Sequence, residues 1–152
     1  MKDLVSIERV ALLHPKFRQS AQDFIEDAEN TLGIKIRVVQ GYRTFAEQDV
    51  IYQQGRTTPG NIVTYSPAGT SYHNYGLAMD LCPFMDSGLS LNWNYNFELL
   101  RPFAVKQGMT LGLDFPKKDS DHFENKYGFN WRDLLHKYQD NDFISGTQYV
   151  NI

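Results

Sequence analysis

The feature that most constrains the fold is one carboxylate inside an otherwise apolar run. Residues Leu77 to Cys82 are apolar at every position except Asp80, and Pro83 follows them. A short apolar run of this kind predicts a buried strand, and a proline ends it. A buried carboxylate is costly unless it is paired or bound to a metal. The run therefore predicts either an ion pair with a buried arginine or a metal site at Asp80.

A histidine seven residues earlier, His73, is a candidate second ligand. Seven residues of straight strand span about 23 Å, whereas the ligands of one zinc ion each lie about 2 Å from it. A shared metal therefore requires the chain to turn between His73 and Asp80, and Gly76 is the residue that permits such a turn. The spacing alone leaves open the interpretation of His73 as an ordinary loop histidine.

A second cluster, Asp119 to Glu124, offers a third ligand in His122 and several candidate bases. Three protein ligands plus a water form the usual catalytic zinc site, although His122 is equally interpreted as a surface histidine in a charged turn. In a regular strand His122 and Glu124 share a face and Asp119 points away. Strand geometry alone therefore favours Glu124 as the base. The absence of an H-E-x-x-H string excludes a thermolysin-like helix.

The remaining patterns predict an α+β domain. Helices are expected over residues 14–32, 44–54, 97–107 and 131–138, a second strand over 34–39, and a long loop over 55–70. A capping-box pattern, Thr44 with Glu47, begins the second of these helices. His14 is expected on the surface and Cys82 in the core. The polar tail from about residue 140 is expected to be peripheral.

Composition narrows the function classes. The 152 residues fit one domain. The net charge of -3 and the absence of a basic run argue against nucleic-acid binding. The single cysteine excludes an internal disulfide. The first residues lack the apolar stretch of a secretory signal, and no segment approaches a membrane span, so synthesis in the cytoplasm without a signal peptide is expected.

Ordered motifs identify a family resemblance. The S-x-H-x-x-G-x-A-x-D string from Ser71 to Asp80 resembles the signature of the zinc D,D-peptidase superfamily, peptidase family M15. More specifically, the similarity is to the L-alanyl-D-glutamate endopeptidases, many of which are phage endolysins, and it runs in family order from about Val38 to Glu124. The blocks that carry it are Gly41–Gln48, Gly55–Thr57, Ser71–Gly76, Gly112–Phe115 and Asp119–Glu124.

The resemblance implies a fold and a set of site residues. The expected fold is a single domain with a central antiparallel sheet and flanking helices, similar to Hedgehog and D,D-peptidase domains. The implied zinc ligands are His73, Asp80 and His122, with Asp119 as the catalytic carboxylate and Arg43 as the contact to the substrate carbonyl. Substrate contacts are expected from Gln48, Arg56, Ser71 and Tyr72. The family often has proline where this chain has Asp121.

The resemblance also implies a bacteriolytic peptidoglycan hydrolase, a zinc metallopeptidase that cuts the L-alanyl-D-glutamate bond of the stem peptide. Residues 1–152 would then be one catalytic domain without a separate cell-wall-binding domain, a monomer that acts in the periplasm or cell wall after release. A D-alanyl-D-alanine carboxypeptidase or dipeptidase is the alternative enzyme. A non-catalytic zinc-binding module is the third possibility, and Asp119 together with Arg43 argues against it.

Overall fold

Four short strands form one antiparallel sheet at the centre of the computed structural model, which describes all residues from 1 to 152. Their spatial order is β1-β2-β4-β3. The strands are β1 (Ile36–Gln40), β2 (Ala78–Pro83), β3 (Thr110–Leu111) and β4 (His122–Glu124). All three strand pairs are antiparallel, which confirms the predicted α+β fold with a central antiparallel sheet.

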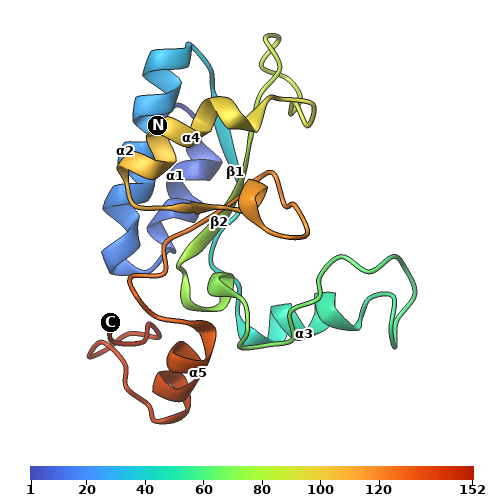
Figure 1. The fold of residues 1–152 in the computed structure, drawn as a ribbon, viewed down its shortest axis with the longest axis vertical. Helices are drawn as coiled ribbons and strands as arrows, with labels where there is room; N and C mark the ends of the chain where they lie inside the picture. The colour runs from blue at the N-terminus through green and yellow to red at the C-terminus, as the bar shows by residue number, and fades with distance from the viewer.

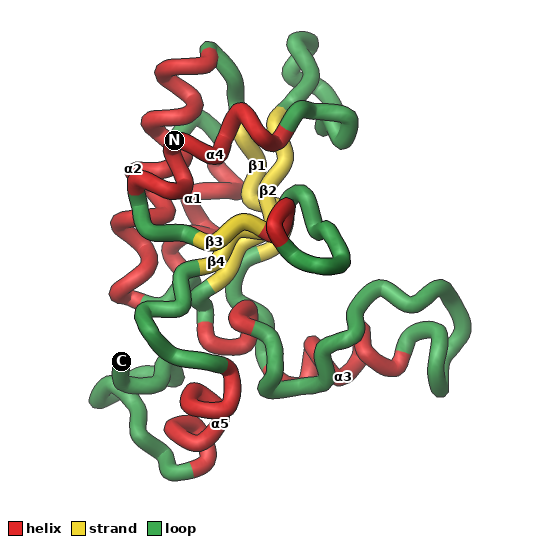
Figure 2. Tube along the Cα trace, viewed as in Figure 1, coloured by secondary structure: helices red, strands yellow, loops and turns green.

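Three helices pack against one side of this sheet, and another reaches away from it (Figure 1, Figure 2). The α-helices are α1 (Leu4–Ala11), α2 (Pro15–Leu32), α3 (Phe45–Gln53), α4 (Arg101–Lys106) and α5 (Trp131–Gln139), and the 3₁₀ helices are η1 (Tyr72–Tyr75), η2 (Phe97–Leu100) and η3 (Gly112–Asp114). Figure 1 shows α1, α2 and α4 gathered on one side of β1 and β2. Figure 2 shows α3 and the loop after it reaching away from the sheet. None of the helices combines the length and the apolar character needed to span a bilayer.

Local capping explains where the predicted helices begin and end. The Thr44 hydroxyl accepts a hydrogen bond from the Glu47 backbone N–H at 3.1 Å, and the Glu47 carboxylate accepts one from the Thr44 N–H at 2.8 Å. This is the predicted capping box. Helix α2 begins at Pro15, whose missing N–H is no loss in a first turn, and ends at Leu32, where Gly33 caps it in the left-handed conformation. The predicted helix over 97–107 is instead divided into η2 and α4, with Pro102 in the first turn of α4.

The two ends of the chain depart from the predictions. His14, expected on the surface, is only 1% exposed, and the tail expected to be peripheral buries Tyr149 and Val150. The His14 Nε2 atom lies 2.9 Å from the Val150 carbonyl oxygen, and the Tyr149 hydroxyl donates to the Leu12 carbonyl at 2.7 Å. Because these partners lie 136 and 137 residues apart, no local pattern predicts their burial.

Strands β2 and β4 separate the core from the functional side of the sheet. Met79 lies opposite Phe123, and both are fully buried. The Phe123 ring packs 5.1 Å from the ring of Phe24 on α2. Since side chains alternate along a strand, the next pair, Asp80 and His122, projects from the opposite face. The alternation places two polar side chains together on the face that α2 does not cover.

Gly76 makes the turn that returns the chain toward β2. It ends η1 in the left-handed conformation, with φ of 69°, as the spacing of His73 and Asp80 requires. Its carbonyl accepts a hydrogen bond from the His14 N–H at 2.9 Å. A Cβ atom on Gly76 would lie only 2.6 Å from that same nitrogen. The turn therefore needs glycine for two reasons, its backbone conformation and its close approach to the start of α2.

We predict that Gly76→Ala lowers the free energy of unfolding by about 3 kcal/mol, from the left-handed backbone and the overlap together. Gly33→Ala is the matched control, because Gly33 has nearly the same φ of 68° and a Cβ atom there would meet no other atom within 4 Å. Gly33→Ala is expected to lower the free energy of unfolding by about 1 kcal/mol, from the left-handed backbone alone. Urea unfolding of both variants makes the comparison, and equal losses would contradict the role given to the close approach.

Candidate metal centre

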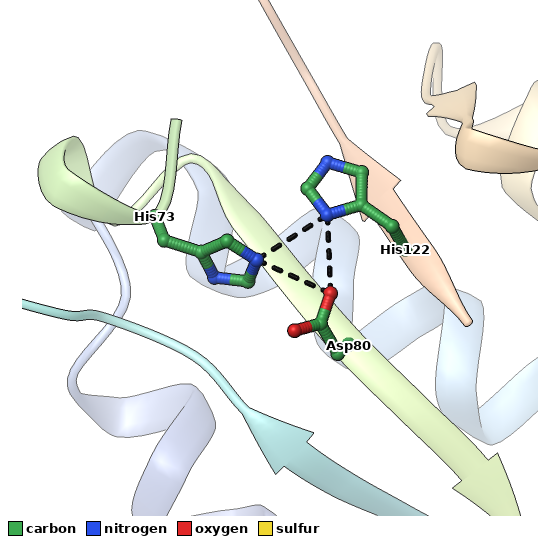
Figure 3. A group of neighbouring side chains, drawn as sticks. All are labelled: His73, Asp80 and His122. Atoms are coloured by element: carbon green, nitrogen blue, oxygen red, sulfur yellow. Dashed lines mark hydrogen bonds and ion pairs between the residues drawn. The ribbon is translucent and has the colours of Figure 1, made fainter. Parts of the chain in front are cut away.

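Three side chains from three elements converge on the open face of the sheet. Asp80 comes from β2 and His122 from β4, where they are direct cross-strand neighbours. His73 comes from η1 and is brought back over the sheet by the turn at Gly76. Figure 3 shows the two imidazole rings and the carboxylate pointing toward one another. The structure thus brings together the three residues that the sequence nominated as metal ligands, along with the turn that their spacing demanded.

The distances within this cluster match those of a tetrahedral metal site. His73 Nε2 lies 3.2 Å from Asp80 Oδ1 and 3.3 Å from His122 Nδ1, and the latter two atoms are 3.1 Å apart. Tetrahedral zinc with bonds of about 2.0 to 2.1 Å places neighbouring ligand atoms about 3.3 Å apart. Two imidazoles and one carboxylate are also a donor set that zinc accepts, with a fourth position left for water. The residues present therefore fit a zinc ion.

The proton positions on the two histidines strengthen this interpretation. His73 Nδ1 lies 2.8 Å from the Gly41 carbonyl oxygen, and because a carbonyl only accepts, Nδ1 carries the proton. His122 Nε2 lies 2.8 Å from Glu124 Oε2 and donates to that carboxylate in the same way. In the neutral rings, His73 Nε2 and His122 Nδ1 then hold lone pairs that face the Asp80 carboxylate. Three acceptors meet with no proton among them, and a cation satisfies all three.

The electrostatics of the cluster also favour a cation. Burial raises the pKa of the Asp80 carboxyl, but His73 and His122 outweigh that effect and hold this pKa well below its usual range. Burial likewise disfavours an imidazolium at His122, yet hydrogen bonds and charges from Asp80 and Glu124 raise its pKa to about 10. Without a metal, the cluster therefore favours a proton on His122, and a bound metal ion would take the place of that proton.

The carboxylate of Glu124 lies behind His122, away from the metal position. Glu124 is 4% exposed and accepts from His122 Nε2, with Lys126 Nζ 3.3 Å from its other oxygen. It therefore orients the imidazole of His122, which is a different task from the base role that strand alternation suggests. Asp121, next to His122 in the chain, is a third carboxylate here. Burial, together with the charges of Asp80 and Asp119, raises its pKa.

Asp119 sits in a tight turn just before β4. The His122 N–H donates to the Asp119 carbonyl at 3.2 Å, so the chain bends between these residues. The Asp119 N–H in turn donates to the Gly112 carbonyl at 3.0 Å. A Cβ atom on Gly112 would lie 2.1 Å from the Asp119 carbonyl oxygen and 2.9 Å from His122 Cβ. Only glycine at 112 allows this approach, a requirement that sequence reasoning did not identify.

Arg43 reaches the cluster from the segment before α3. Its Nη2 lies 4.0 Å from Asp80 Oδ2, and its backbone N–H donates to the His73 carbonyl at 3.0 Å. Burial lowers the pKa of the Arg43 guanidinium, while the charges of Asp80, Glu47 and Asp119 oppose that shift. Arg43 is thus a positive group at the edge of the cluster, where it interacts with the charges of Asp80 and Asp119.

Gln48, on α3, holds the side chain of Arg43 through a hydrogen bond. Its Oε1 accepts a hydrogen bond from Arg43 Nη1 at 3.0 Å, and its Nε2 donates to the Ser66 carbonyl at 2.7 Å. Gln48 is fully buried and does not line the cleft, so its position differs from that expected of a substrate contact. It connects Arg43 to the loop wall that contains Ser66.

A cleft of about 1000 Å³ opens over the cluster. The sequence-predicted residues in its lining are Arg43, Ser71, Tyr72, His73, Asp80, Asp119, His122 and Glu124. Arg56 lies outside this lining. Its guanidinium packs 3.9 Å from the Tyr52 ring centroid and donates to the carbonyls of Tyr52 and, at 3.1 Å, Thr64. The cleft therefore has the metal cluster at its floor and the loop between α3 and η1 as one wall.

Comparison with known proteins gives a consistent set of relatives. Residues 10–133 match the family model described as VanY: D-alanyl-D-alanine carboxypeptidase. The chain is 45% identical over 86 residues to the peptidoglycan L-alanyl-D-glutamate endopeptidase CwlK of Bacillus subtilis (strain 168). That similarity covers 57% of this chain and 50% of CwlK, so the chain spans about half the length of this curated relative.

Two solved structures share the fold. One is the L-Ala D-Glu endopeptidase ChiX of Serratia marcescens, with a TM-score of 0.59 at 20% identity over 82% of this chain and 88% of ChiX. The other is the E175A mutant of the vancomycin resistance D,D-pentapeptidase VanY, from a VanB-type cassette and in complex with Zn(II). Its TM-score is 0.57 at 18% identity, over 82% of this chain and 78% of that one.

We predict that Glu124→Gln weakens zinc binding by about 10- to 100-fold, because the ring of His122 loses a charged partner that orients it and raises its basicity. Competition with a chromophoric chelator measures the dissociation constant. Glu98→Gln is the control, since Glu98 pairs with Arg101 in an exposed ion pair outside the cleft. Unchanged zinc affinity in Glu124→Gln would contradict the supporting role of Glu124.

Proposed function

The chain belongs to the VanY D-alanyl-D-alanine carboxypeptidase family, and from this premise we propose that it is a zinc-dependent peptidase that hydrolyses the L-alanyl-D-glutamate bond in the stem peptide of peptidoglycan. One observation carries the proposal: three lone pairs converge at the floor of a cleft that also presents Arg43 and Asp119. The choice of bond follows the similarity to CwlK, which is named an L-alanyl-D-glutamate endopeptidase.

His73, Asp80 and His122 would hold the zinc ion in this proposal. When bound, zinc lowers the pKa of its water to about 7 and polarises the scissile carbonyl. Hydrogen bonds from the other ring nitrogen of each histidine, to Gly41 and to Glu124, fix the orientation of the two imidazole rings. The ligand atoms therefore need no rearrangement to receive the ion.

Asp119 is the proposed general base and acid. A carboxylate in this role takes a proton from the attacking water and passes it to the leaving amine. Asp119 is exposed in the lining of the cleft, and its backbone is held by Gly112 and His122. Glu124 is occupied by His122 and Lys126, so it is less able to move a proton at the reaction centre.

Arg43 is the proposed donor to the oxyanion that develops on the scissile carbonyl. A guanidinium remains charged at any working pH and donates in a fixed fork, which suits this task. Gln48 holds one of its nitrogens and leaves the rest of the fork free for the cleft. Ser71 and Tyr72 line the cleft beside it. Because the Tyr72 hydroxyl donates to the Phe129 carbonyl at 2.8 Å, Tyr72 offers its ring to the substrate more than its hydroxyl.

The proposal extends to the setting in which the enzyme works. Its substrate places its action in the cell wall or periplasm, with a stem peptide as its partner. We infer that the protein acts as a monomer with one catalytic domain, as an endolysin or a related wall hydrolase. A D-alanyl-D-alanine carboxypeptidase is the second candidate, because the matching family model carries that description.

Incubation of the zinc-loaded protein with purified cell-wall sacculi tests the proposal. We expect new amino-terminal D-glutamate, and we expect a chelator to abolish its appearance and added zinc to restore it. Released D-alanine would instead support the carboxypeptidase. The absence of any new amino terminus or free amino acid with zinc bound would overturn both enzymatic functions and favour a non-catalytic zinc module.

Two variants in the same assay separate the candidate bases. Asp119→Asn is expected to lower the rate by at least about 100-fold, because loss of a general acid–base group costs about that much or more, while one zinc ion remains bound. Glu124→Gln at saturating zinc is expected to keep most of the activity. An inactive Glu124→Gln beside an active Asp119→Asn would reverse the assignment.

A further inference from the structure

One feature of the cleft is not used by the proposed reaction. Lys117, on the loop after η3, places its Nζ 3.7 Å from the centroid of the Tyr65 ring, on the loop after α3. Both residues line the cleft, so two loops far apart in sequence meet at this contact. The Lys117 ammonium lowers the pKa of the Tyr65 hydroxyl, which is exposed to solvent. The contact thus presents a cation and a phenol side by side in the cleft wall.

Arg56 adds a second positive group to the same ring. Its guanidinium carbon lies 5.9 Å from the Tyr65 centroid. The bonds of Arg56 to the carbonyls of Tyr52 and Thr64 hold it in place while leaving other guanidinium hydrogens free. We call the group of Arg56, Tyr65 and Lys117 the carboxylate corner.

The cations of the carboxylate corner lack acidic partners. Elsewhere on the surface, Arg101 pairs with Asp114 at 2.8 Å and Lys106 with Asp27 at 2.6 Å. Neither Lys117 nor Arg56 has a carboxylate oxygen within 4.0 Å. This occurs in a chain with 18 acidic and 15 basic residues, where acidic partners are not scarce. The corner therefore offers an ammonium, a guanidinium and a hydroxyl, which together suit an incoming carboxylate.

We propose that the carboxylate corner is a specificity subsite that binds the free carboxylate of the D-glutamate residue in the substrate. The inference rests on the proposed function, because glutamate has two carboxyl groups and only one is used to continue the peptide. The other remains charged close to the bond to be cut. Because Arg43 is assigned to the scissile carbonyl, recognition of this free carboxylate needs other donors. Lys117 and Tyr65 supply them within the same cleft, and Arg56 lies beside them, outside the lining.

The test compares peptides that differ only in this charge. Zinc-loaded Asp119→Asn protein, which binds without cutting, is titrated calorimetrically with L-alanyl-D-glutamyl-L-lysine and with the same peptide amidated at the free glutamate carboxyl. We expect the free acid to bind about fivefold more tightly, the size of an exposed charge-assisted contact. In the Asp119→Asn background, Lys117→Gln is expected to remove this difference in affinity between the two peptides, and Lys117→Arg is expected to retain it. A third peptide is amidated at glutamate and carries a carboxylate on the side chain of its third residue. It tests whether the corner binds a carboxylate of that residue instead of the glutamate carboxylate.

Lys16→Gln is the matched control, because Lys16 also lies over a tyrosine ring, 5.0 Å from the centroid of Tyr127, outside the cleft. It is expected to leave the preference unchanged. Equal binding of the two peptides by the parent, an undiminished preference in Lys117→Gln, or a preference that follows only the third side chain would each overturn the subsite. If the protein with Asp119 intact cuts neither peptide but the Lys117-dependent preference in binding persists, the subsite stands and the proposed function fails.

Discussion

The structure depends on one arrangement, the meeting of three lone pairs at the floor of a cleft. His73 and His122 each turn a protonated nitrogen outward, to Gly41 and Glu124, and present the other nitrogen to Asp80. In the neutral rings no donor lies among these atoms, so the folded chain holds a cluster that a cation completes. The antiparallel register that sets Asp80 opposite His122, and the turn that returns His73, both serve this convergence.

The surrounding fold supplies rigidity on one side and access on the other. Behind the sheet, Phe24 and Phe123 pack in a core that fixes the strand positions. In front, loops build the cleft walls, which is the usual division between a rigid scaffold and a variable working surface. Gln48 links Arg43 to one of these walls, because it is buried and binds both Arg43 and the loop carbonyl of Ser66. The side chain of Arg43 is therefore held in place by a buried amide.

Much of this was predictable from local sequence patterns, and the remainder was not for a physical reason. A carboxylate in an apolar strand predicted a paired or metal-binding Asp80, and a metal shared with His73 required a turn, for which Gly76 was the candidate. The ligand set itself came from the family resemblance. Capping residues predicted the start of α3. Contacts between distant segments left no such local signal. The burial of His14 by the carboxy-terminal tail depends on a partner 136 residues away, and the need for Gly112 depends on a neighbouring loop that periodicity does not describe.

X-ray absorption spectroscopy of the protein loaded with one equivalent of zinc tests the central claim most directly, because it reports which atoms bind the ion. The account predicts a single site with two imidazole nitrogens and one or two oxygens at about 2.0 to 2.1 Å, in tetrahedral geometry and without sulfur. Exchange of either His73 or His122 for alanine should remove one imidazole from that shell. A shell of oxygens alone, or one that contains the Cys82 sulfur, would contradict the account.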